Sequence, residues 1–230
     1  MIRKYINRLI TKLKGDTFEL DKDIPLSYIF MLCISRLISL IYGIIRLRMF
    51  KRIFISPSVK LVCPSKMHFG KNVSIERGCY IDALSKEGLF IGDNCSIGLN
   101  TTIKLTGSIR NMANKVVIGK NVGLGTHGYY GCGVGNLIIG DDTIIGNYVS
   151  FHPENHNYED HNVLIRLQGV NSNGGGIKIG RNCWIGAKAT FLDGAQLGDN
   201  CIVAAGAVVN KAFPDNVIIG GVPARIIKQK

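Results

Sequence analysis

Large aliphatic or aromatic residues return at every sixth position along most of this chain. The longest uninterrupted run comprises Ile179, Ile185, Phe191, Leu197, Val203 and Val209. Shorter runs with the same spacing comprise Phe69, Ile75 and Ile81; Ile91, Ile97 and Ile103; Ile118, Leu124 and Tyr130; and Ile139, Ile145 and Phe151. Neither helical periodicity nor strand alternation produces this spacing. A short fixed repeat is typical of a β-helix, in which each repeat supplies one short strand and one corner.

The second and fifth positions of this six-residue repeat are small. Glycine follows the large residue directly at Gly70, Gly92, Gly98, Gly119, Gly125, Gly131, Gly140, Gly146, Gly180, Gly186 and Gly198. A residue without Cβ lets the backbone bend or pass close to a neighbouring coil. The fifth position holds Val73, Cys79, Cys95, Thr101, Val122, Thr143, Val149, Cys183, Ala189, Ala195, Cys201 and Ala207. Alternating large and small inward residues would fill a narrow prism in which each coil packs against the next.

Cysteine usage changes this picture little. Four of the seven cysteines, Cys79, Cys95, Cys183 and Cys201, occupy the small fifth position of the repeat. We therefore expect them to be buried apolar residues in a reducing compartment. The chain has no CxxC pair and no cleavable-signal pattern at its start, so the sequence predicts a cytoplasmic protein.

The first part of the chain does not follow the repeat, and we expect two regions: a basic, apolar helical segment over residues 1–55 and a β-helix over residues 56–230. The first region carries eleven lysines and arginines against four acidic residues, out of a net charge of +12 for all 230 residues. The apolar stretch from Ile24 to Ile45 has nearly the ~20 residues that a membrane-spanning helix needs.

Arg36, near the middle of that stretch, disfavours a membrane span because a lone cation at the bilayer centre is costly. Basic flanks around apolar residues suit a helix lying on an anionic membrane surface. Packing against the protein's own β-helix or a neighbouring subunit fits the pattern equally well. No stacking aromatic residues or binding motif accompany the positive charge, so a nucleic-acid partner is not expected.

Two segments interrupt the repeat, from Leu105 to Val117 and, as a long protruding loop, over residues 153–176. Long excursions from a regular scaffold commonly carry binding or catalytic residues. The second excursion contains His156 and His161, and His152 lies just before it. Three of the five histidines therefore lie within ten residues of one another, beside several acidic residues.

Three segments together resemble the hexapeptide-repeat acyltransferases: SFHPENHNYED, IGRNCWIGAKATFLDGAQLGDN and AAGAVVNKAFPDNVIIGGVPARIIK. Within that family the chain is most similar to sugar O-acetyltransferases of the galactoside and maltose type and to surface-glycan acetyltransferases. The resemblance covers roughly Phe69 to the C-terminus. It implies a left-handed parallel β-helix and a homotrimer with active sites in the grooves between subunits. It also implies acetyl-CoA as co-substrate, with no metal.

The resemblance also implies a set of site residues. The general base is His156, in the Asn155-His156 element of the loop. The residues that correspond to the family's acetyl-CoA contacts are Trp184, Ala187, Ala205, Asn210, Lys211, Arg225 and Lys228. Asn210 replaces a threonine of the family pattern, and Lys228 replaces a frequent arginine, which is not an equivalent phosphate ligand. Asn155 and His127 are the candidate acceptor contacts.

These residue types suit direct acyl transfer. A neutral imidazole, with an ordinary pKa of about 6.5, takes the proton of a sugar hydroxyl as the oxygen attacks the thioester. The expected function is therefore O-acetylation of a carbohydrate in surface polysaccharide biosynthesis (O-antigen, capsule or exopolysaccharide), at a peripheral site on the inner face of the membrane and with an acceptor that is free or lipid-linked.

Three alternatives stay open. An N-acetyltransferase of amino sugars would use the same donor groove and base. The His-x4-His spacing of His156 and His161 also occurs in γ-class carbonic anhydrases, which hold zinc on a β-helix, although their histidines lie on regular repeats. The metal content of the purified protein tests this alternative. A non-catalytic trimeric scaffold is the third alternative, and binding of acyl-CoA distinguishes an acetyltransferase from it.

Overall fold

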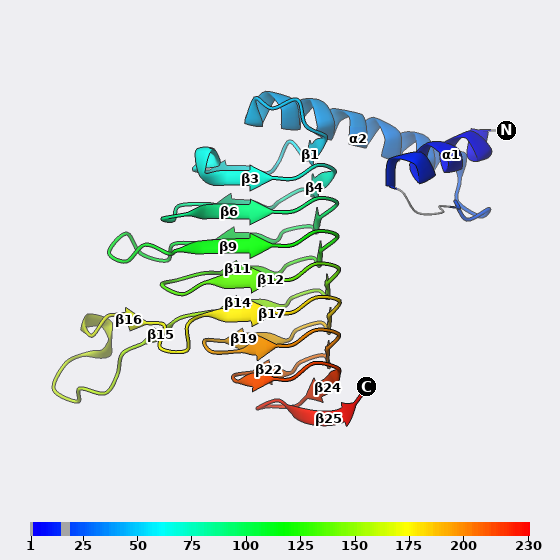
Figure 1. The fold of residues 1–230 in the computed structure, drawn as a ribbon. Helices are drawn as coiled ribbons and strands as arrows, with labels where there is room; N and C mark the ends of the chain where they lie inside the picture. Colours follow the sequence, from blue (N-terminus) through cyan, green and yellow to red (C-terminus); the bar gives the residue numbers. More distant parts are fainter. Residues whose placement is uncertain (1, 15–18) are drawn as a thin grey trace. The chain divides into compact units, whose positions relative to one another are not determined.

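The computed structural model describes residues 2–14 and 19–230, and the remaining residues of the expected N-terminal segment lie outside the described part. Three sheets of parallel strands wind around a common core from residue 53 onwards, and the last strand of one sheet is antiparallel to its neighbour (Figure 1). We name them sheets A, B and C. The parallel strands and the six-residue repeats fit a left-handed β-helix, and the expected N-terminal helices are present.

The chain visits the three sheets in turn. Sheet A contains β1 (Ile53–Ile55), β4 (Val73–Ile75), β7 (Ser96–Ile97), β10 (Gly123–Leu124), β13 (Ile144–Ile145), β18 (Trp184–Ile185), β21 (Ile202–Val203), β24 (Val217–Gly220) and β25 (Arg225–Gln229). Sheet B contains β2 (Lys60–Val62), β5 (Tyr80–Asp82), β8 (Thr102–Lys104), β11 (Tyr129–Gly131), β14 (Ser150–His152), β19 (Thr190–Leu192) and β22 (Val208–Val209). Sheet C contains β3 (Met67–Phe69), β6 (Gly88–Ile91), β9 (Lys115–Ile118), β12 (Leu137–Ile139), β17 (Ile177–Ile179), β20 (Gln196–Leu197) and β23 (Ala212–Phe213).

Strand register places the large residue of each repeat directly above the next. Ile97 pairs with Leu124, Leu124 with Ile145, and Ile145 with Ile185, and all four are buried. In sheet B, the rings of Tyr130, Phe151 and Phe191 stack in the same way on three successive coils. The hydrophobic core is therefore a set of columns along the coil axis, as the repeat predicts. Cys79, Cys95, Cys183 and Cys201 are buried in it with free thiols.

The corner between sheets C and A is built from one residue type. At each turn a residue with positive φ carries a short amide or carboxylate side chain: Asn72, Asn94, Asn121, Asp142, Asn182, Asn200 and Asn216. Asparagine and aspartate tolerate this left-handed conformation better than most residues. The side chains are also hydrogen-bonded from coil to coil, for example Asn182 Nδ2 to Asn200 Oδ1 at 2.7 Å. This corner is an asparagine ladder along the coil.

Glycine at the second repeat position allows successive coils to approach closely. A Cβ on Gly146 would lie 2.7 Å from the Ala187 amide nitrogen, and one on Gly186 would lie 2.5 Å from that of Ala205. Real Cβ atoms do not approach a nitrogen so closely, so a side chain here would push the coils apart.

The N-terminal region contains α1 (Ile2–Lys14) and α2 (Leu26–Leu47). Contacts divide the chain into two units after Ile38, within α2. In the larger unit, Tyr42 and Leu47 at the end of α2 pack against the core, and a Cβ on Gly43 would collide with the carbonyl oxygen of Ile53. The end of α2 therefore covers the first coil. The proposed domain boundary after residue 55 stays a prediction, and β1 pairs with β4 within the coil.

Both interruptions of the repeat leave the coil between sheets B and C. The first lies between β8 and β9. The second, between β14 and β17, contains an antiparallel pair, β15 (Asn155–His156) with β16 (Val170–Asn171), and a 3-10 turn, η2 (Ile165–Leu167). In Figure 1, β15 and β16 (yellow-green) stand away from the stacked strands. We call residues 153–176 the inserted hairpin. The only other 3-10 turn in the described residues is η1 (Pro64–Lys66).

Candidate active site

His152 is the last residue of β14, at the point where the chain leaves sheet B for the inserted hairpin. Its imidazole stacks on the ring of Tyr129 from the preceding coil, with centroids 5.3 Å apart and planes 22° from parallel. Partial burial lowers the pKa of His152, and the nearby Glu154 carboxylate opposes this shift. A lowered pKa keeps the imidazole neutral at physiological pH, the form that accepts a proton.

The Tyr129 ring reaches His152 because the residue between them has no side chain. A Cβ on Gly131 would lie 3.0 Å from Cε1 of Tyr129 and 3.0 Å from the carbonyl oxygen of Phe151. Burial, followed by the charge of Glu154, raises the pKa of Tyr129, so its phenol stays protonated. Tyr129 therefore presents a neutral hydroxyl and one ring face beside the imidazole.

Glu154 is held against the turn that follows β11. Its Oε2 accepts a hydrogen bond from the amide of Val134 at 3.1 Å. Gly133, with φ of 56°, makes room for the carboxylate, because a Cβ there would collide with it. A fixed negative charge thus acts electrostatically on both His152 and Tyr129.

His156 lies in β15, where it pairs with Val170, and its side chain is exposed. His161 is also exposed, in the turn of the inserted hairpin. Asn155, the candidate acceptor contact, donates from Nδ2 to Asp193 Oδ2 at 3.3 Å. The sequence-based choice of His156 as general base stays a prediction, and the structure gives His152 the more distinctive surroundings.

Asp193 fixes both ends of the inserted hairpin to the next coil. Besides Asn155, its carboxylate accepts hydrogen bonds from Ser172 Oγ at 2.9 Å, the Gly174 amide at 2.8 Å and the Gly176 amide at 2.9 Å. Two of these four donors are the backbone amides of Gly174 and Gly176. If residue 193 had no carboxylate, both amides would lose their hydrogen-bond acceptor. Asp193 is a positioning residue that sequence reasoning did not identify.

We expect Asp193→Ala to loosen the inserted hairpin while leaving the coil folded. Amide hydrogen exchange across residues 155–176 should accelerate, with strands such as β12 and β18 unchanged, because the lost bonds all belong to the hairpin. Hydrogen-exchange mass spectrometry measures this directly. Asp215→Ala is the matched control, since Asp215 accepts an amide of the coil from Asp199 at 2.8 Å. Equal exchange in the hairpin of both variants would contradict this role.

His127 lies at the corner between sheets A and B, away from the hairpin. Its φ is 57°, Nδ2 of Asn100 lies 3.1 Å from its Nε2, and its ring stacks on Tyr148 with centroids 4.8 Å apart. It is exposed, so it is available to a ligand at that corner.

The residues predicted to contact acetyl-CoA follow the C-terminal coils. Trp184 lies in β18 between Ile144 and Ile202 and is 58% exposed. A tryptophan on the outer face of a coil exposes a large apolar surface, which is typical of a contact site. Ala187 and Ala205 follow β18 and β21 at the corner between sheets A and B. These three positions therefore share one edge of the molecule.

The other residues predicted to contact acetyl-CoA, one asparagine and three cationic residues, lie at the C-terminal end. Asn210 and Lys211 follow β22 and are exposed, and Lys211 Nζ lies 5.5 Å from the centroid of the Phe213 ring. Arg225 and Lys228 lie in β25 and are exposed. Both salt bridges found in the described part of the chain involve other residues, Lys115–Glu87 and Arg181–Asp199. The Arg225 guanidinium contacts the carbonyl oxygen of Ala224 at 2.9 Å. Among the residues that the structure describes, no carboxylate pairs with this guanidinium and would compete with phosphate.

The structure brings some of the predicted residues together and leaves others apart. Asn155 and His156 lie together in β15, whereas Trp184 lies in sheet A and Ala187 and Ala205 lie at the corner that follows it. In the described residues, no hydrogen bond, ion pair or ring contact joins His156 to any of the donor residues. No group of three or more histidines, cysteines or acidic residues is arranged there to hold a metal ion.

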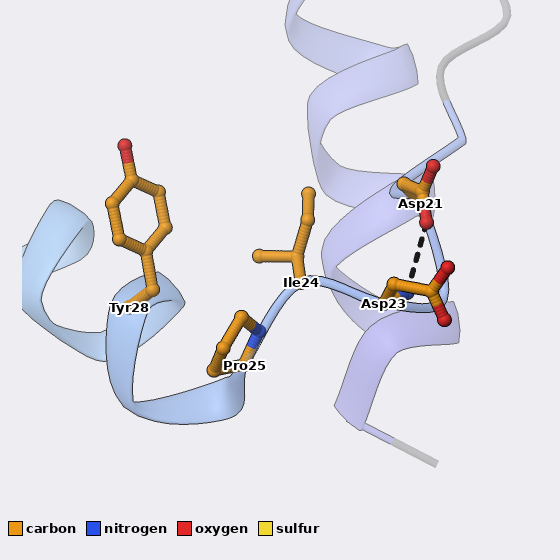
Figure 2. A pocket seen from close by; sticks show the side chains of 5 residues that line it. All are labelled: Asp21, Asp23, Ile24, Pro25 and Tyr28. Atoms are coloured by element: carbon orange, nitrogen blue, oxygen red, sulfur yellow. Dashed lines mark hydrogen bonds between the residues drawn. The ribbon is translucent and has the colours of Figure 1, made fainter.

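A pocket in the N-terminal unit contains none of the predicted site residues. It is lined by Asp21, Asp23, Ile24, Pro25 and Tyr28, and the amide of Asp23 donates to Asp21 Oδ1 at 2.8 Å (Figure 2). All five lining residues belong to the N-terminal unit, so none of them is part of the β-helix.

Family models match two stretches of the coil. "Bacterial transferase hexapeptide (six repeats)" matches residues 176–211, and "Hexapeptide repeat of succinyl-transferase" matches residues 88–109. The first stretch contains Trp184, Ala187, Ala205, Asn210 and Lys211.

Several curated proteins are similar to this chain. A galactoside O-acetyltransferase of Escherichia coli K12 is 32% identical over 40% of this chain and 44% of its own length. A putative lipopolysaccharide biosynthesis O-acetyl transferase, WbbJ, of the same organism is 25% identical over 71% of each chain. A probable acetyltransferase of Mycobacterium tuberculosis is 31% identical over 62% of this chain and 44% of its own length. The chain thus spans less than half of two of these relatives.

Among solved structures, a mutant of AntD, an N-acyltransferase from Bacillus cereus, superimposes with a TM-score of 0.50 and 19% identity. The match covers 78% of this chain and 81% of that one, and it supports the fold. The repeat models and the relatives named as acetyltransferases confirm the predicted resemblance of this chain to the hexapeptide-repeat acyltransferases.

Proposed function

We propose that this chain transfers an acetyl group from acetyl-CoA to a hydroxyl group of a sugar, as a step in the modification of a surface polysaccharide. The observation that carries the proposal is the transferase repeat at 176–211, which contains most of the expected donor contacts and follows a histidine-bearing hairpin directly. The relatives named as galactoside and lipopolysaccharide O-acetyltransferases support a carbohydrate acceptor.

The proposed chemistry is a direct transfer. The sugar oxygen attacks the thioester carbonyl carbon while a histidine accepts the hydroxyl proton. A C–O bond forms, the C–S bond breaks, and the proton passes on to the thiolate of coenzyme A. The thioester is already activated, so no covalent enzyme intermediate is needed.

We propose His152, rather than His156, as the histidine that accepts the proton. Both side chains are exposed, but His152 lies on a strand of the coil, stacked on Tyr129, whereas His156 lies on the inserted hairpin. A base held by rigid packing keeps the geometry that proton transfer requires. Burial keeps the pKa of His152 low, which maintains the neutral form without a further partner.

The pH dependence of turnover tests this assignment. The pKa of His152 lies below its ordinary value. We therefore expect kcat to be full at neutral pH and to decrease only at pH values below ~6.5, where the imidazole becomes protonated. Glu154 raises this pKa, so Glu154→Gln should move the limb to still lower pH. Glu159→Gln, on the exposed part of the hairpin, is the matched control. A limb that moves to higher pH in Glu154→Gln would contradict the assignment.

The donor and acceptor halves of the proposal are tested separately. Calorimetric titration with coenzyme A and acetyl-CoA measures donor binding. Release of free thiol from acetyl-CoA, followed with and without a panel of glycans, measures transfer. Thiol release that depends on a glycan supports acyl transfer to sugar, and chemical analysis of the product separates an ester from the amide of an N-acetyltransferase. Absence of coenzyme A binding would leave only a scaffold role.

We also propose that the active form is a homotrimer with acetyl-CoA bound in the grooves between subunits. The donor edge of Trp184, Ala187 and Ala205 lies apart from the base of the hairpin within one chain. A groove between two subunits lets one chain supply the donor edge and its neighbour the base. Cyclic symmetry then produces three equal sites.

The N-terminal unit is proposed to bind an anionic membrane surface, which would place the enzyme at the inner face of the cell membrane near a lipid-linked acceptor. α1 carries five basic residues, and α2 exposes apolar side chains that include Tyr28, Phe30 and Met31. By length and composition, α2 is the one described helix able to cross a membrane. Tyr42 and Leu47 near the end of this helix pack against the core of the coil, however, so less than the full 22-residue helix is available to cross the ~30 Å hydrocarbon core. A helix lying in the interface fits this length better.

Removal of residues 1–38 tests this proposal while keeping the end of α2 and β1. We expect the shortened protein to stay trimeric and to bind acetyl-CoA. It should lose sedimentation with phosphatidylglycerol vesicles, because each basic residue near such a surface contributes ~1 kcal/mol. Vesicles of phosphatidylcholine alone are the control for the electrostatic part. Unchanged sedimentation, or dissociation into monomers, would rule out the membrane role.

A further inference from the structure

The corner between sheets A and B differs from the asparagine ladder at the corner between sheets C and A. Its positive-φ positions hold, from the second coil onwards, Gly78, Asn100, His127, Tyr148, Lys188 and Gly206. Glycine or asparagine would satisfy the backbone at each of them, as the other corner demonstrates. Three successive coils instead carry long, exposed side chains there.

Tyr148 is the most unusual of these residues. Its φ of 59° is a conformation that bulky residues rarely adopt, and its ring is 54% exposed. The ring therefore gains little from burial to offset the backbone strain. Backbone strain of this kind persists at sites where a side chain is needed for function. Here the strained position aims an aromatic ring outward beside His127, on which it stacks.

A second aromatic pair lies on the same two coils. Tyr129, the first residue of β11, stacks on His152, the last residue of β14, and Tyr129 is 37% exposed. Tyr148 lies at the corner that precedes β14, and His152 is the last residue of that strand. Between them lies Ser150, whose Oγ is 3.3 Å from the Thr190 hydroxyl on the next coil. The four rings and these hydroxyls form a strip across sheet B, which we call the aromatic strip.

We propose that the aromatic strip is the acceptor subsite, which binds pyranose rings by stacking and ends at His152. This inference rests on the proposed function and names the residues that would recognise its acceptor. The C–H face of a pyranose packs on the face of an aromatic ring, because the ring's negative quadrupole attracts the weakly positive hydrogens. The sugar hydroxyls at the ring edge meet Ser150, Thr190 and the imidazoles as hydrogen-bond partners.

The charge and geometry of the strip favour a sugar over a charged ligand. The rings of Tyr129 and Tyr148 offer no charge, and the carboxylate of Glu154 acts at the His152 end. A phosphate would be repelled there. The strip ends at His152, so the sugar hydroxyl nearest that residue is placed to lose its proton.

The test uses substitutions that protect the fold. Tyr148→Asn places at this corner the residue that the opposite corner uses at every turn except that of Asp142, so the melting temperature of this variant should stay within about 4 °C of wild type. Lys188→Asn is the matched control at the same corner, on the next coil. Tyr129→Leu removes the second ring, and Tyr80→Leu is its control, since Tyr80 has the same place in sheet B two coils away.

Binding is measured by saturation-transfer NMR with methyl β-galactopyranoside, methyl α-glucopyranoside and methyl N-acetylglucosaminide, which have no aromatic group. Calorimetric binding of acetyl-CoA is measured on the same samples. We expect at least one glycoside to bind wild type, Lys188→Asn and Tyr80→Leu, and we expect Tyr148→Asn and Tyr129→Leu to lose at least tenfold in its affinity. Acetyl-CoA affinity should stay within twofold of wild type.

The proposed subsite would be overturned if the wild-type protein bound none of the glycosides. It would also be overturned if all five proteins bound a glycoside with equal affinity. A loss of acetyl-CoA affinity in Tyr148→Asn with glycoside binding intact would also overturn it, because the ring would then serve the donor. Failure of the proposed function has a different signature, in which acetyl-CoA does not bind the wild-type protein at all. The glycoside measurement does not depend on turnover, so it judges the subsite in either case.

Discussion

We expect His152→Ala to lower kcat by about two to four orders of magnitude, while the affinity for acetyl-CoA stays nearly unchanged. General-base catalysis contributes on this scale, and the residue lies on sheet B, away from the donor edge of sheet A. Steady-state kinetics with acetyl-CoA and a saturating glycan acceptor, together with calorimetry of coenzyme A binding, check both parts.

His156→Ala and His161→Ala are the matched controls for this prediction. Both side chains are exposed on the inserted hairpin, so their loss leaves the coil unaffected. We expect less than a tenfold change in kcat for each. An inactive His156→Ala beside an active His152→Ala would reinstate the residue that sequence resemblance indicates as the base, and the stacking of His152 on Tyr129 would then be structural.

The second large effect concerns the donor end of the coil. Arg225→Ala should raise the Michaelis constant for acetyl-CoA about tenfold or more with little change in kcat, because a charge-assisted contact to phosphate contributes about 1.5–3 kcal/mol. Arg225 is exposed in β25, and its guanidinium contacts only a carbonyl oxygen among the described hydrogen bonds. Kinetics with acetyl-CoA concentration varied at fixed acceptor check the split.

Lys230→Ala, at the chain end, is the control for loss of a positive charge near the same surface. Dephospho-CoA then locates the contact. If Arg225 binds the ribose 3′-phosphate, the wild-type enzyme should bind dephospho-CoA more weakly, whereas Arg225→Ala should bind both forms alike. A Michaelis constant that rises equally in Lys230→Ala would show that bulk charge, rather than a specific contact, governs donor binding.

The repeat alone predicts most of the coil. A large residue every sixth position predicts which side chains point inward, and Ile97, Leu124, Ile145 and Ile185 lie in one buried column as expected. The small fifth position likewise predicts that Cys183 and Cys201 are buried thiols. Such predictions succeed because each coil packs only against its neighbours, so a local pattern determines local packing.

The site is less predictable because it depends on which residues of different coils lie side by side. Tyr129 and His152 are 23 residues apart, and only the register of β11 on β14 brings their rings together. The role of Asp193 is similarly hidden, since an insertion separates it from Asn155 in sequence. One local signal was available: His152 follows Phe151 directly, at the second position of a repeat, and therefore on the rigid coil.

The N-terminal helices illustrate a different limit. Hydropathy predicts α2 from its composition, but composition does not reveal that its last turns cover the first coil. The close approach of Gly43 to the carbonyl of Ile53 is a tertiary contact between a helix and a strand. The length of helix left for a membrane follows only from that contact, which is why a span and a surface helix remain open alternatives on the sequence alone.

Transfer of an isotopically labelled acetyl group tests the central claim most directly. The wild-type protein is incubated with acetyl-CoA carrying ¹³C at the carbonyl carbon and with glycans of the surface-polysaccharide type, and the label is followed by NMR. We predict that the carbonyl signal moves from the thioester to an ester on a sugar oxygen, and that His152→Ala slows this by at least a hundredfold. A label that stays on coenzyme A, or that appears as acetate at the same rate with and without glycan, would contradict the account.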